Sequence, residues 1–253
     1  MVLPPGVVMD VLTEFPSRFY VNLGRRPDRR AGMIRGLGEV GLDAERVPAV
    51  DARWLEKRVG GKRRVTGGFD TAARYAVGMS IRMALRKAAM MKAAAVLIFE
   101  DDVVFSPDFE EAAAGLELPD DWGMFYFGCL HMTRARLIGD GIVRVARAVD
   151  THAFAVRAPY YREIIKVLSP WGHRGAARLR NSDALISDLH ESIPSYAAWP
   201  NLAWQAQDGA SDITGLRNGN YTETGEQRCW ADKGVPFGAE PLKELEVTTN
   251  EHE

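Results

Sequence analysis

Two kinds of hydrophobic pattern take turns along the chain: short continuous runs, and longer stretches with helical spacing. Continuous apolar runs are typical of buried strands, whereas apolar positions three and four residues apart are typical of helices. The predicted strands are Arg18–Leu23, Arg46–Val50, Ala95–Phe99, Gly123–Cys129, Ala153–Val156 and Ser195–Trp199. The predicted helices begin at about Pro27 and cover Thr71–Lys92, Pro159–Leu168 and Ser182–His190.

This alternation predicts an α/β protein with a mixed, mostly parallel, Rossmann-like sheet flanked by helices. In such sheets, ligands bind at the carboxyl ends of the strands. We expect residues 1–214 to form a single domain. From about Gly215 onward polar residues and glycine dominate, which predicts a polar C-terminal extension over residues 215–253 that is peripheral or partly disordered.

Composition narrows the class only slightly. The 253 residues are 46% hydrophobic and 26% charged with a net charge of -2, which is typical of a soluble globular protein. Cys129 and Cys229 stand far apart and form no metal-binding motif, so we expect no disulfide scaffold and a reducing, cytoplasmic location. The sequence shows no secretion leader pattern, and no window predicts a transmembrane segment.

Three consecutive carboxylates, Glu100-Asp101-Asp102, follow directly after the predicted strand Ala95–Phe99. Adjacent like charges raise one another's pKa and cost free energy unless a cation or hydrogen-bond donors offset them. A hard divalent ion, Mn²⁺ or Mg²⁺, does this well because it prefers carboxylate oxygens and shares ligands with a diphosphate. The alternative is a solvated turn before a helix, and nucleotidyltransferases also carry acidic residues in such positions.

Five segments resemble, in order, the blocks of glycosyltransferase family 25, the lipooligosaccharide and collagen galactosyltransferases. They are FYVNLGRRPDRR (Phe19–Arg30), RVPAVDA (Arg46–Ala52), VLIFEDDVVFSPDF (Val96–Phe109), THAFAV (Thr151–Val156) and PNLAWQAQDGASDI (Pro200–Ile213). The resemblance implies a GT-A fold and a metal-dependent hexosyltransferase that uses a nucleotide sugar, most simply a UDP-sugar. It also implies an acidic motif related to the DXD motif.

One block departs from the family pattern. The family has G-C-x-x-S-H at the start of its central helix, where this chain reads Gly78-Met79-Ser80-Ile81-Arg82-Met83. The Ser-His pair is thus replaced by Arg82-Met83, which leaves the donor sugar and the acceptor open.

The resemblance assigns roles around the nucleotide. It places Asn22 and Leu23 along the nucleotide pocket, lets Arg26 and Arg29 reach the diphosphate, and makes Asp51 a partner of the base or ribose. Helical arginines are also common as plain surface charges, and Asp51 also suits a turn.

Within the acidic triplet, Asp102 is the expected metal ligand. Glu100 and Asp101 are expected to help through the metal, a bound water or the ribose. GT-A enzymes often add a later histidine, for which His152 and His190 are the two candidates, although either also suits a buried core position.

An inverting transfer needs a carboxylate base that accepts the proton of the acceptor hydroxyl. The resemblance favours Asp183 for this role, with Asp188 as the second choice. Ser211 and Asp212 are expected to close the site.

The acceptor expected from the resemblance is a bacterial surface glycan. The basic segment Lys57–Arg64 keeps a second acceptor open, DNA with hydroxymethylated bases, and hydroxylated protein is a third. Two other classes of function also remain: a sugar nucleotidyltransferase, and a non-catalytic module that binds nucleotide sugars. The sequence lacks a complete GxSxG, HExxH, GxGxxG or P-loop motif, which argues against hydrolases, zinc proteases, dehydrogenases and P-loop ATPases.

Overall fold

The computed structural model describes residues 11–59, 72–169 and 181–206. Its centre is a sheet of 8 strands in the order β2-β1-β3-β8-β5-β9-β7-β6. The strands are β1 (Ser17–Asn22), β2 (Glu45–Pro48), β3 (Ala95–Glu100), β5 (Met124–His131), β6 (Arg136–Gly139), β7 (Ile142–Arg144), β8 (Ala148–Arg157) and β9 (Ser195–Ala198). Only β8 and β7 run against the common direction of the sheet. The predicted mixed, mostly parallel sheet is thus confirmed.

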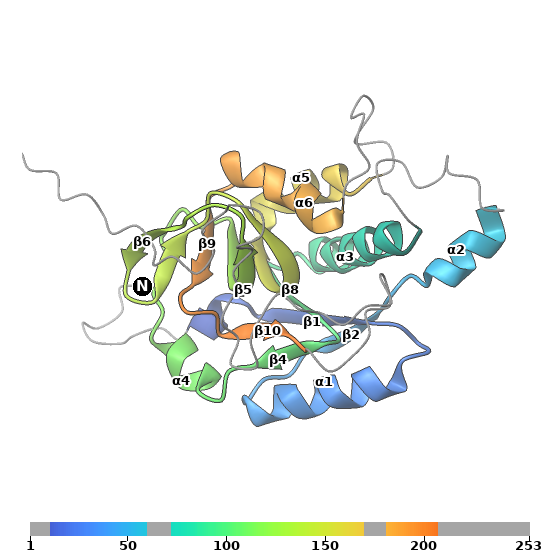
Figure 1. The fold of residues 1–253 in the computed structure, drawn as a ribbon, viewed down its shortest axis with the longest axis horizontal. Helices are drawn as coiled ribbons and strands as arrows, with labels where there is room; N and C mark the ends of the chain where they lie inside the picture. The colour runs from blue at the N-terminus through green and yellow to red at the C-terminus, as the bar shows by residue number, and fades with distance from the viewer. Residues whose placement is uncertain (1–10, 60–71, 170–180, 207–253) are drawn as a thin grey trace, which may run out of the picture.

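Helices lie on both faces of this sheet, and a small second sheet pairs β4 (Val103–Phe105) with β10 (Ala203–Gln205) (Figure 1). In Figure 1, α3, α5 and α6 lie above the main sheet, whereas α1 and the β4–β10 pair lie below it. The helices are η1 (Val11–Glu14), α1 (Pro27–Glu39), α2 (Ala52–Val59), α3 (Ala72–Met90), α4 (Phe109–Ala114), η3 (Ala158–Tyr160), α5 (Tyr161–Val167), α6 (Ser182–Ser187) and η4 (Asp188–Glu191).

Strand β3 shows how the sequence produces two cores. Its side chains alternate between the faces, so Val96 and Ile98 join the core beneath α3, whereas Leu97 and Phe99 join the core beside α1. All four are completely buried, which explains why the strand reads as one continuous apolar run. The same alternation directs Glu100, at the end of the strand, toward the α3 side.

Every strand and helix predicted above is present where the structure describes its residues, with bounds that shift by a few positions. The sequence reading missed the short elements η1, α2, α4, β4, β6, β7 and β10. Strand β8 is longer than predicted because Ala148 and Val149, which precede the polar residues 150–152, also pair with β5. The predicted helix Ser182–His190 is divided into α6 and the tighter η4.

The small sheet approaches the main sheet most closely at Gly128. A Cβ atom on this residue would lie 1.7 Å from the carbonyl oxygen of Ala203, so only glycine fits beneath β10. This close contact brings Gln205, the last residue of β10, to the end of β3.

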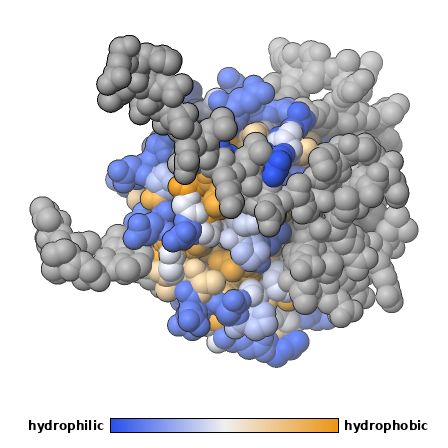
Figure 2. Space-filling model, turned by 60° about the vertical axis from the view of Figure 1, so that its left-hand side comes forward, coloured by the Kyte–Doolittle hydropathy of each residue, from blue (hydrophilic) through white to orange (hydrophobic). Residues whose placement is uncertain are grey.

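Large exposed hydrophobic side chains come from several elements of the described surface: Ile34, Trp54, Met83, Met90, Met91 and Val104. Viewed from the side of β6 and α4, hydrophilic and hydrophobic residues are intermixed (Figure 2). Among the described helices, none combines the length and the apolar character that a membrane crossing requires.

Candidate active site at the carboxyl ends of the strands

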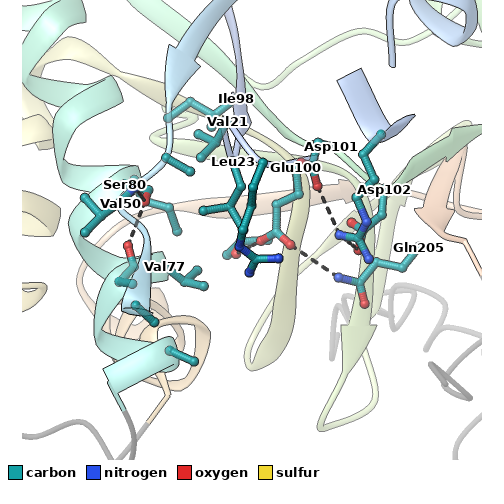
Figure 3. A pocket seen from close by; sticks show the side chains of 18 residues that line it. Val21, Leu23, Val50, Val77, Ser80, Ile98, Glu100, Asp101, Asp102 and Gln205 are labelled. Carbon is teal, nitrogen blue, oxygen red and sulfur yellow. Dashed lines mark hydrogen bonds and ion pairs between the residues drawn. The ribbon is translucent and has the colours of Figure 1, made fainter. Parts of the chain in front are cut away.

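A cavity of about 130 Å³ lies where β1 and β3 end and α3 begins. Figure 3 shows its two contrasting ends. The apolar end is lined by Val21, Leu23, Ala49, Val50, Ala52, Ala73, Ala76, Val77, Ile81 and Ile98. The polar end is lined by Arg25, Arg29, Glu100, Asp101, Asp102, Thr151 and Gln205. Ser80 lies beside Val50 at the apolar end.

Ser80 joins the loop after β2 to α3. The backbone N–H of Val50 donates to Ser80 Oγ at 2.9 Å, and Ser80 Oγ donates to the carbonyl oxygen of Ala76 at 2.7 Å. These bonds fix Val50 against α3, and Val50 thereby forms part of the apolar wall of the cavity.

Asp101 is held on both of its carboxylate oxygens. Asn22 Nδ2 donates to Oδ2 at 2.6 Å, and Arg29 donates to Oδ1 at 3.0 Å. Asn22 is itself buried, and its Oδ1 accepts a bond from Arg46 Nε at 3.0 Å. The predicted nucleotide-pocket residue Asn22 therefore lies behind the carboxylates and orients one of them, whereas Leu23 lines the cavity.

Glu100 is held by neutral donors. Thr151 Oγ1 donates to Oε1 at 3.0 Å, and Gln205 Nε2 donates to Oε2 at 3.3 Å. Burial raises the pKa of Glu100 to about 8, and the charges of Asp102, Asp150 and Asp183 add to this rise against the opposing bond from Thr151.

Asp102 has one paired and one unpaired oxygen. Its Oδ2 accepts a bond from Arg29 at 3.0 Å, whereas its Oδ1 is buried and has no hydrogen-bond partner within the described residues. Burial raises the pKa of Asp102, even though the charge of Arg29 opposes the rise. Conversely, the pKa of Arg29 is raised because the charges of Asp102 and Asp101 outweigh the lowering effect of burial.

The unpaired Oδ1 decides whether this chain suits a divalent ion. In the described part of the chain, no group of three or more His, Cys, Asp or Glu side chains is arranged to hold a metal. A buried carboxylate oxygen without a donor nevertheless costs free energy, and a divalent cation would relieve that cost. The residues therefore fit a metal bound through Asp102, with its remaining ligands supplied from outside this set.

A bulge in β8 decides which side chains face the cavity. Gly128 pairs with Ala153 and Leu130 with Val149, so β8 uses four steps where β5 uses two. Asp150, within this bulge, has a φ of 69°, in the left-handed region. As a result Thr151 turns toward Glu100, whereas His152 turns away toward β10.

The two predicted histidine ligands both lie in the interior. His152 Nε2 is 3.0 Å from the carbonyl oxygen of Ala203. His190 Nε2 is 2.9 Å from Tyr126 Oη, and its Nδ1 accepts a bond from the N–H of Ala148 at 3.3 Å. Burial lowers the pKa of each histidine to about 4, and neither lines the cavity. The structure does not bring them to the acidic triplet.

The two predicted bases lie in different surroundings. Asp183, at the first turn of α6, accepts bonds from the N–H of Ala184 at 2.8 Å and of Asp150 at 3.4 Å. It lies close enough to Glu100 for its charge to raise the pKa of that residue. Asp188 is 42% exposed and lies 3.6 Å from Arg147 at the surface. Of the two, the structure brings only Asp183 toward the site.

The remaining predicted residues surround the site. Arg26 pairs with the exposed Asp28 at 2.7 Å rather than with the triplet. Asp51 accepts a bond from the N–H of Arg53 at 2.9 Å at the start of α2, and its other oxygen is 3.2 Å from Arg25. Asp51 thus holds an arginine that lines the cavity.

Two predictions lie outside the described residues: the closing pair Ser211 and Asp212, and the extension 215–253. The departure from the family pattern at Arg82-Met83 lies away from the cavity, and Met83 is 42% exposed.

Sequence reasoning gave no role to Thr151, Gln205 or Asp150, although the first two lie in segments that resemble the family. Regular alternation would have placed His152, not Thr151, on the face that carries Phe154 beneath α3. The bulge in β8 exchanges the faces of Thr151 and His152, and no simple residue pattern predicts the bulge.

Three insect proteins named "Glycosyltransferase 25 family member" align with the chain. The Anopheles gambiae protein is 32% identical over 203 residues, 74% of this chain and 32% of its own length. The Drosophila melanogaster protein is 30% identical over 210 residues, 74% and 31% respectively. The Aedes aegypti protein is 33% identical over 126 residues, 44% and 20% respectively. The chain is a homologue of glycosyltransferase 25 family members. It spans between a fifth and a third of these relatives.

No protein-family model matches the chain. Solved structures share only the broad arrangement of the fold. A197 from STIV has a TM-score of 0.40 and 13% identity, covering 76% of this chain and 86% of its own. A glycosyltransferase involved in the glycosylation of the major capsid of PBCV-1 has a TM-score of 0.41 and 10% identity. The match covers 73% of this chain and 82% of that one. A Drosophila galactosyltransferase 7 mutant in complex with manganese, UDP-Gal and xylobiose has a TM-score of 0.39 and 9% identity. The match covers 86% of this chain and 78% of that one. At these TM-scores the structures carry no functional argument.

Proposed function

We propose that the chain is a metal-dependent glycosyltransferase with one GT-A domain over residues 1–214. It moves a hexose from a nucleotide sugar, most simply a UDP-sugar, to an acceptor hydroxyl with inversion at the anomeric carbon. Homology to glycosyltransferase 25 family members supports the reaction class.

The observation that carries the proposal is the two-ended cavity. A nucleoside diphosphate sugar has a flat apolar base at one end and a charged diphosphate at the other. The cavity offers Leu23, Val50 and Val77 at one end, and Arg25, Arg29 and the acidic triplet at the other. The triplet alone would repel a diphosphate, so a cation is needed between them.

The metal ion, Mn²⁺ or Mg²⁺, would be held by Asp102 and would supply positive charge that stabilises the diphosphate as a leaving group. The chain itself orients the carboxylates. Asn22 and Arg29 hold Asp101, and Thr151 and Gln205 hold Glu100.

Proton transfer falls to Asp183. As the acceptor oxygen bonds to the anomeric carbon, the bond from that carbon to the diphosphate breaks, and the hydroxyl proton passes to the Asp183 carboxylate. The backbone N–H groups of Ala184 and Asp150 hold that carboxylate at the start of α6. The balanced products are the glycosylated acceptor and the nucleoside diphosphate.

For the acceptor we propose a glycan, and a bacterial surface glycan as the first to test. The alternative of hydroxymethylated DNA depends on the basic segment Lys57–Arg64, whose side chains lie outside the described residues, so no contact in the structure favours it.

The test is a donor screen with purified protein, Mn²⁺ and UDP-glucose, UDP-galactose or UDP-N-acetylglucosamine, with and without glycan acceptors. We expect release of UDP, and loss of that release in Asp102→Asn but not in the surface variant Asp188→Asn. Formation of UTP and sugar 1-phosphate from the UDP-sugar when inorganic diphosphate is added would instead identify a nucleotidyltransferase. Binding of a donor without any turnover would identify a binding module. If no nucleotide sugar binds, the proposal fails.

A further inference from the structure

Arg29 occupies the place that a cation shared by Asp101 and Asp102 would take. One nitrogen of its guanidinium, NH1, is 3.0 Å from Asp101 Oδ1 and 3.0 Å from Asp102 Oδ2. The side chains of Arg29, Asp101 and Asp102 are 15%, 10% and 20% exposed, so water screens the three charges only weakly.

The position of this nitrogen matters because a metal bridging the same two oxygens would have to displace it. A metal held through Asp102 Oδ1 alone would still lie beside the guanidinium, and two positive charges at that distance repel each other. In either arrangement the metal and the observed Arg29 position oppose one another.

The structure also provides room for Arg29 to move. Its side chain lines the cavity described above, and it lines a second cavity of about 750 Å³ between α1 and β4. Arg29, Asp101 and Asp102 are the three residues that both cavities share. The guanidinium can therefore leave the carboxylates in either direction without moving a strand or helix.

We propose that Arg29 is a resident counter-cation of the acidic triplet, which a divalent ion displaces, and that the released guanidinium then pairs with the diphosphate of the donor. This inference rests on the proposed function for the donor's identity, whereas the exchange between Arg29 and the metal does not depend on it. Metal and nucleotide binding are coupled as a consequence, because the metal frees an arginine for the nucleotide.

The first experiment measures Mn²⁺ binding calorimetrically with no nucleotide present. We expect Arg29→Gln to bind Mn²⁺ at least about tenfold more tightly than the unmodified chain, because a close positive charge is gone. The control is Arg25→Gln, which removes a charge that lines the same cavity and lies 3.2 Å from Asp51. We expect it to change Mn²⁺ affinity less than about threefold. Equal or weaker binding by Arg29→Gln, or an equal gain in the control, overturns the proposal.

The second experiment measures thermal unfolding and guards against simple damage to the fold. Without its counter-cation the triplet repels itself, so Arg29→Gln should unfold at a lower temperature in EDTA and regain most of the loss in saturating Mn²⁺. Arg25→Gln should show no such metal-specific recovery. A loss that Mn²⁺ does not restore contradicts the exchange.

The third experiment measures UDP binding with and without Mn²⁺. Mn²⁺ should strengthen UDP binding more in the unmodified chain than in Arg29→Gln, because only the former has an arginine to release. An equal effect in both contradicts the coupling. If Mn²⁺ restores Arg29→Gln but no donor is turned over, the exchange stands and the proposed function fails. If sugar transfer proceeds and Mn²⁺ does not bind, the exchange fails and the transferase assignment stands.

Discussion

The two sides of the site hold their carboxylates in different ways. On the Asn22 side, formed by Asn22, Arg29 and Asp101, both carboxylate oxygens of Asp101 are bonded, one of them to a cation. On the Thr151 side, formed by Glu100, Thr151 and Asp183, the carboxylates receive bonds from hydroxyl, amide and backbone N–H donors of the described residues.

The difference has a physical consequence. Because both oxygens of Asp101 are bonded, its carboxylate keeps a fixed geometry, which suits a structural role or a ligand role. Glu100, which is buried near other carboxylates and bonded by neutral donors, has a raised pKa and so binds a proton more readily. In the proposed function, the first side would hold the donor and the second would exchange protons.

Asp102→Asn removes the second carboxylate that Arg29 contacts on the Asn22 side, and it should have the largest effect. It removes the carboxylate with the buried, unpaired oxygen, and we expect UDP-sugar turnover to fall by about a thousandfold or more. Circular dichroism should show an intact fold. Turnover within tenfold of the unmodified chain would remove Asp102 from the metal site.

Asp183→Asn tests the Thr151 side and should lower turnover by about 10²- to 10⁴-fold, because the amide cannot accept the proton. Donor binding, measured by calorimetry with UDP, should stay nearly unchanged. The matched control is Asp188→Asn on the same segment, where the exposed side chain contacts Arg147 and we expect full activity. Loss of turnover in Asp188→Asn with full activity in Asp183→Asn would instead make Asp188 the base.

Asn22→Ala tests whether the Asn22 side is held rigidly. The change leaves buried groups of Asp101 and Arg46 without their donor or acceptor, so we expect a loss of about 2 to 3 kcal/mol in the free energy of unfolding. A chemical denaturation curve gives that value directly. A loss below about 0.5 kcal/mol, the size of an ordinary surface substitution, would contradict it.

Glu100→Gln should change stability by an amount that depends on pH. Burial raises the pKa of Glu100 in the folded state to about 8 from an ordinary value of 4.5. Its contribution to stability is therefore fully present below about pH 4.5 and is lost as the pH rises toward 8.

In EDTA, the melting temperature of Glu100→Gln relative to the unmodified chain should consequently increase by about ten degrees between pH 5 and pH 9. The exposed Glu191→Gln serves as the control and should show no such trend. A difference that stays constant with pH would mean that Glu100 is ionised throughout the range.

Much of the fold was readable from the sequence because buried strands and amphipathic helices carry their own periodicity. Strand β3 is the clearest example, since its position predicted both the centre of the sheet and the placement of the acidic triplet. Short elements escaped detection: β4 and β10 have three residues each, too few for a period to show.

The contacts between side chains of the site were harder to predict from the sequence than the fold. The sequence placed Arg29 near a diphosphate, whereas the structure pairs it with Asp101 and Asp102. It proposed His152 from a motif, whereas the bulge at Asp150 turns Thr151 to the cavity instead. The partners of Arg29 lie 72 and 73 residues away in the sequence, so no local pattern indicates these ion pairs. The bulge in β8 adds only two residues to one strand, and it too produces no recognisable pattern.

The sequence by itself thus determined the α/β architecture, the acidic triplet at the end of β3 and, through homology, the family to which the chain is related. Only the tertiary structure decided that Asp101 is held, that Asp102 keeps an unpaired oxygen, and that Arg29 lies between them. The physical reason is that periodicity records which face of an element is buried. The partner of a buried charge depends instead on which distant segments the packed sheet and helices bring within about 3 Å.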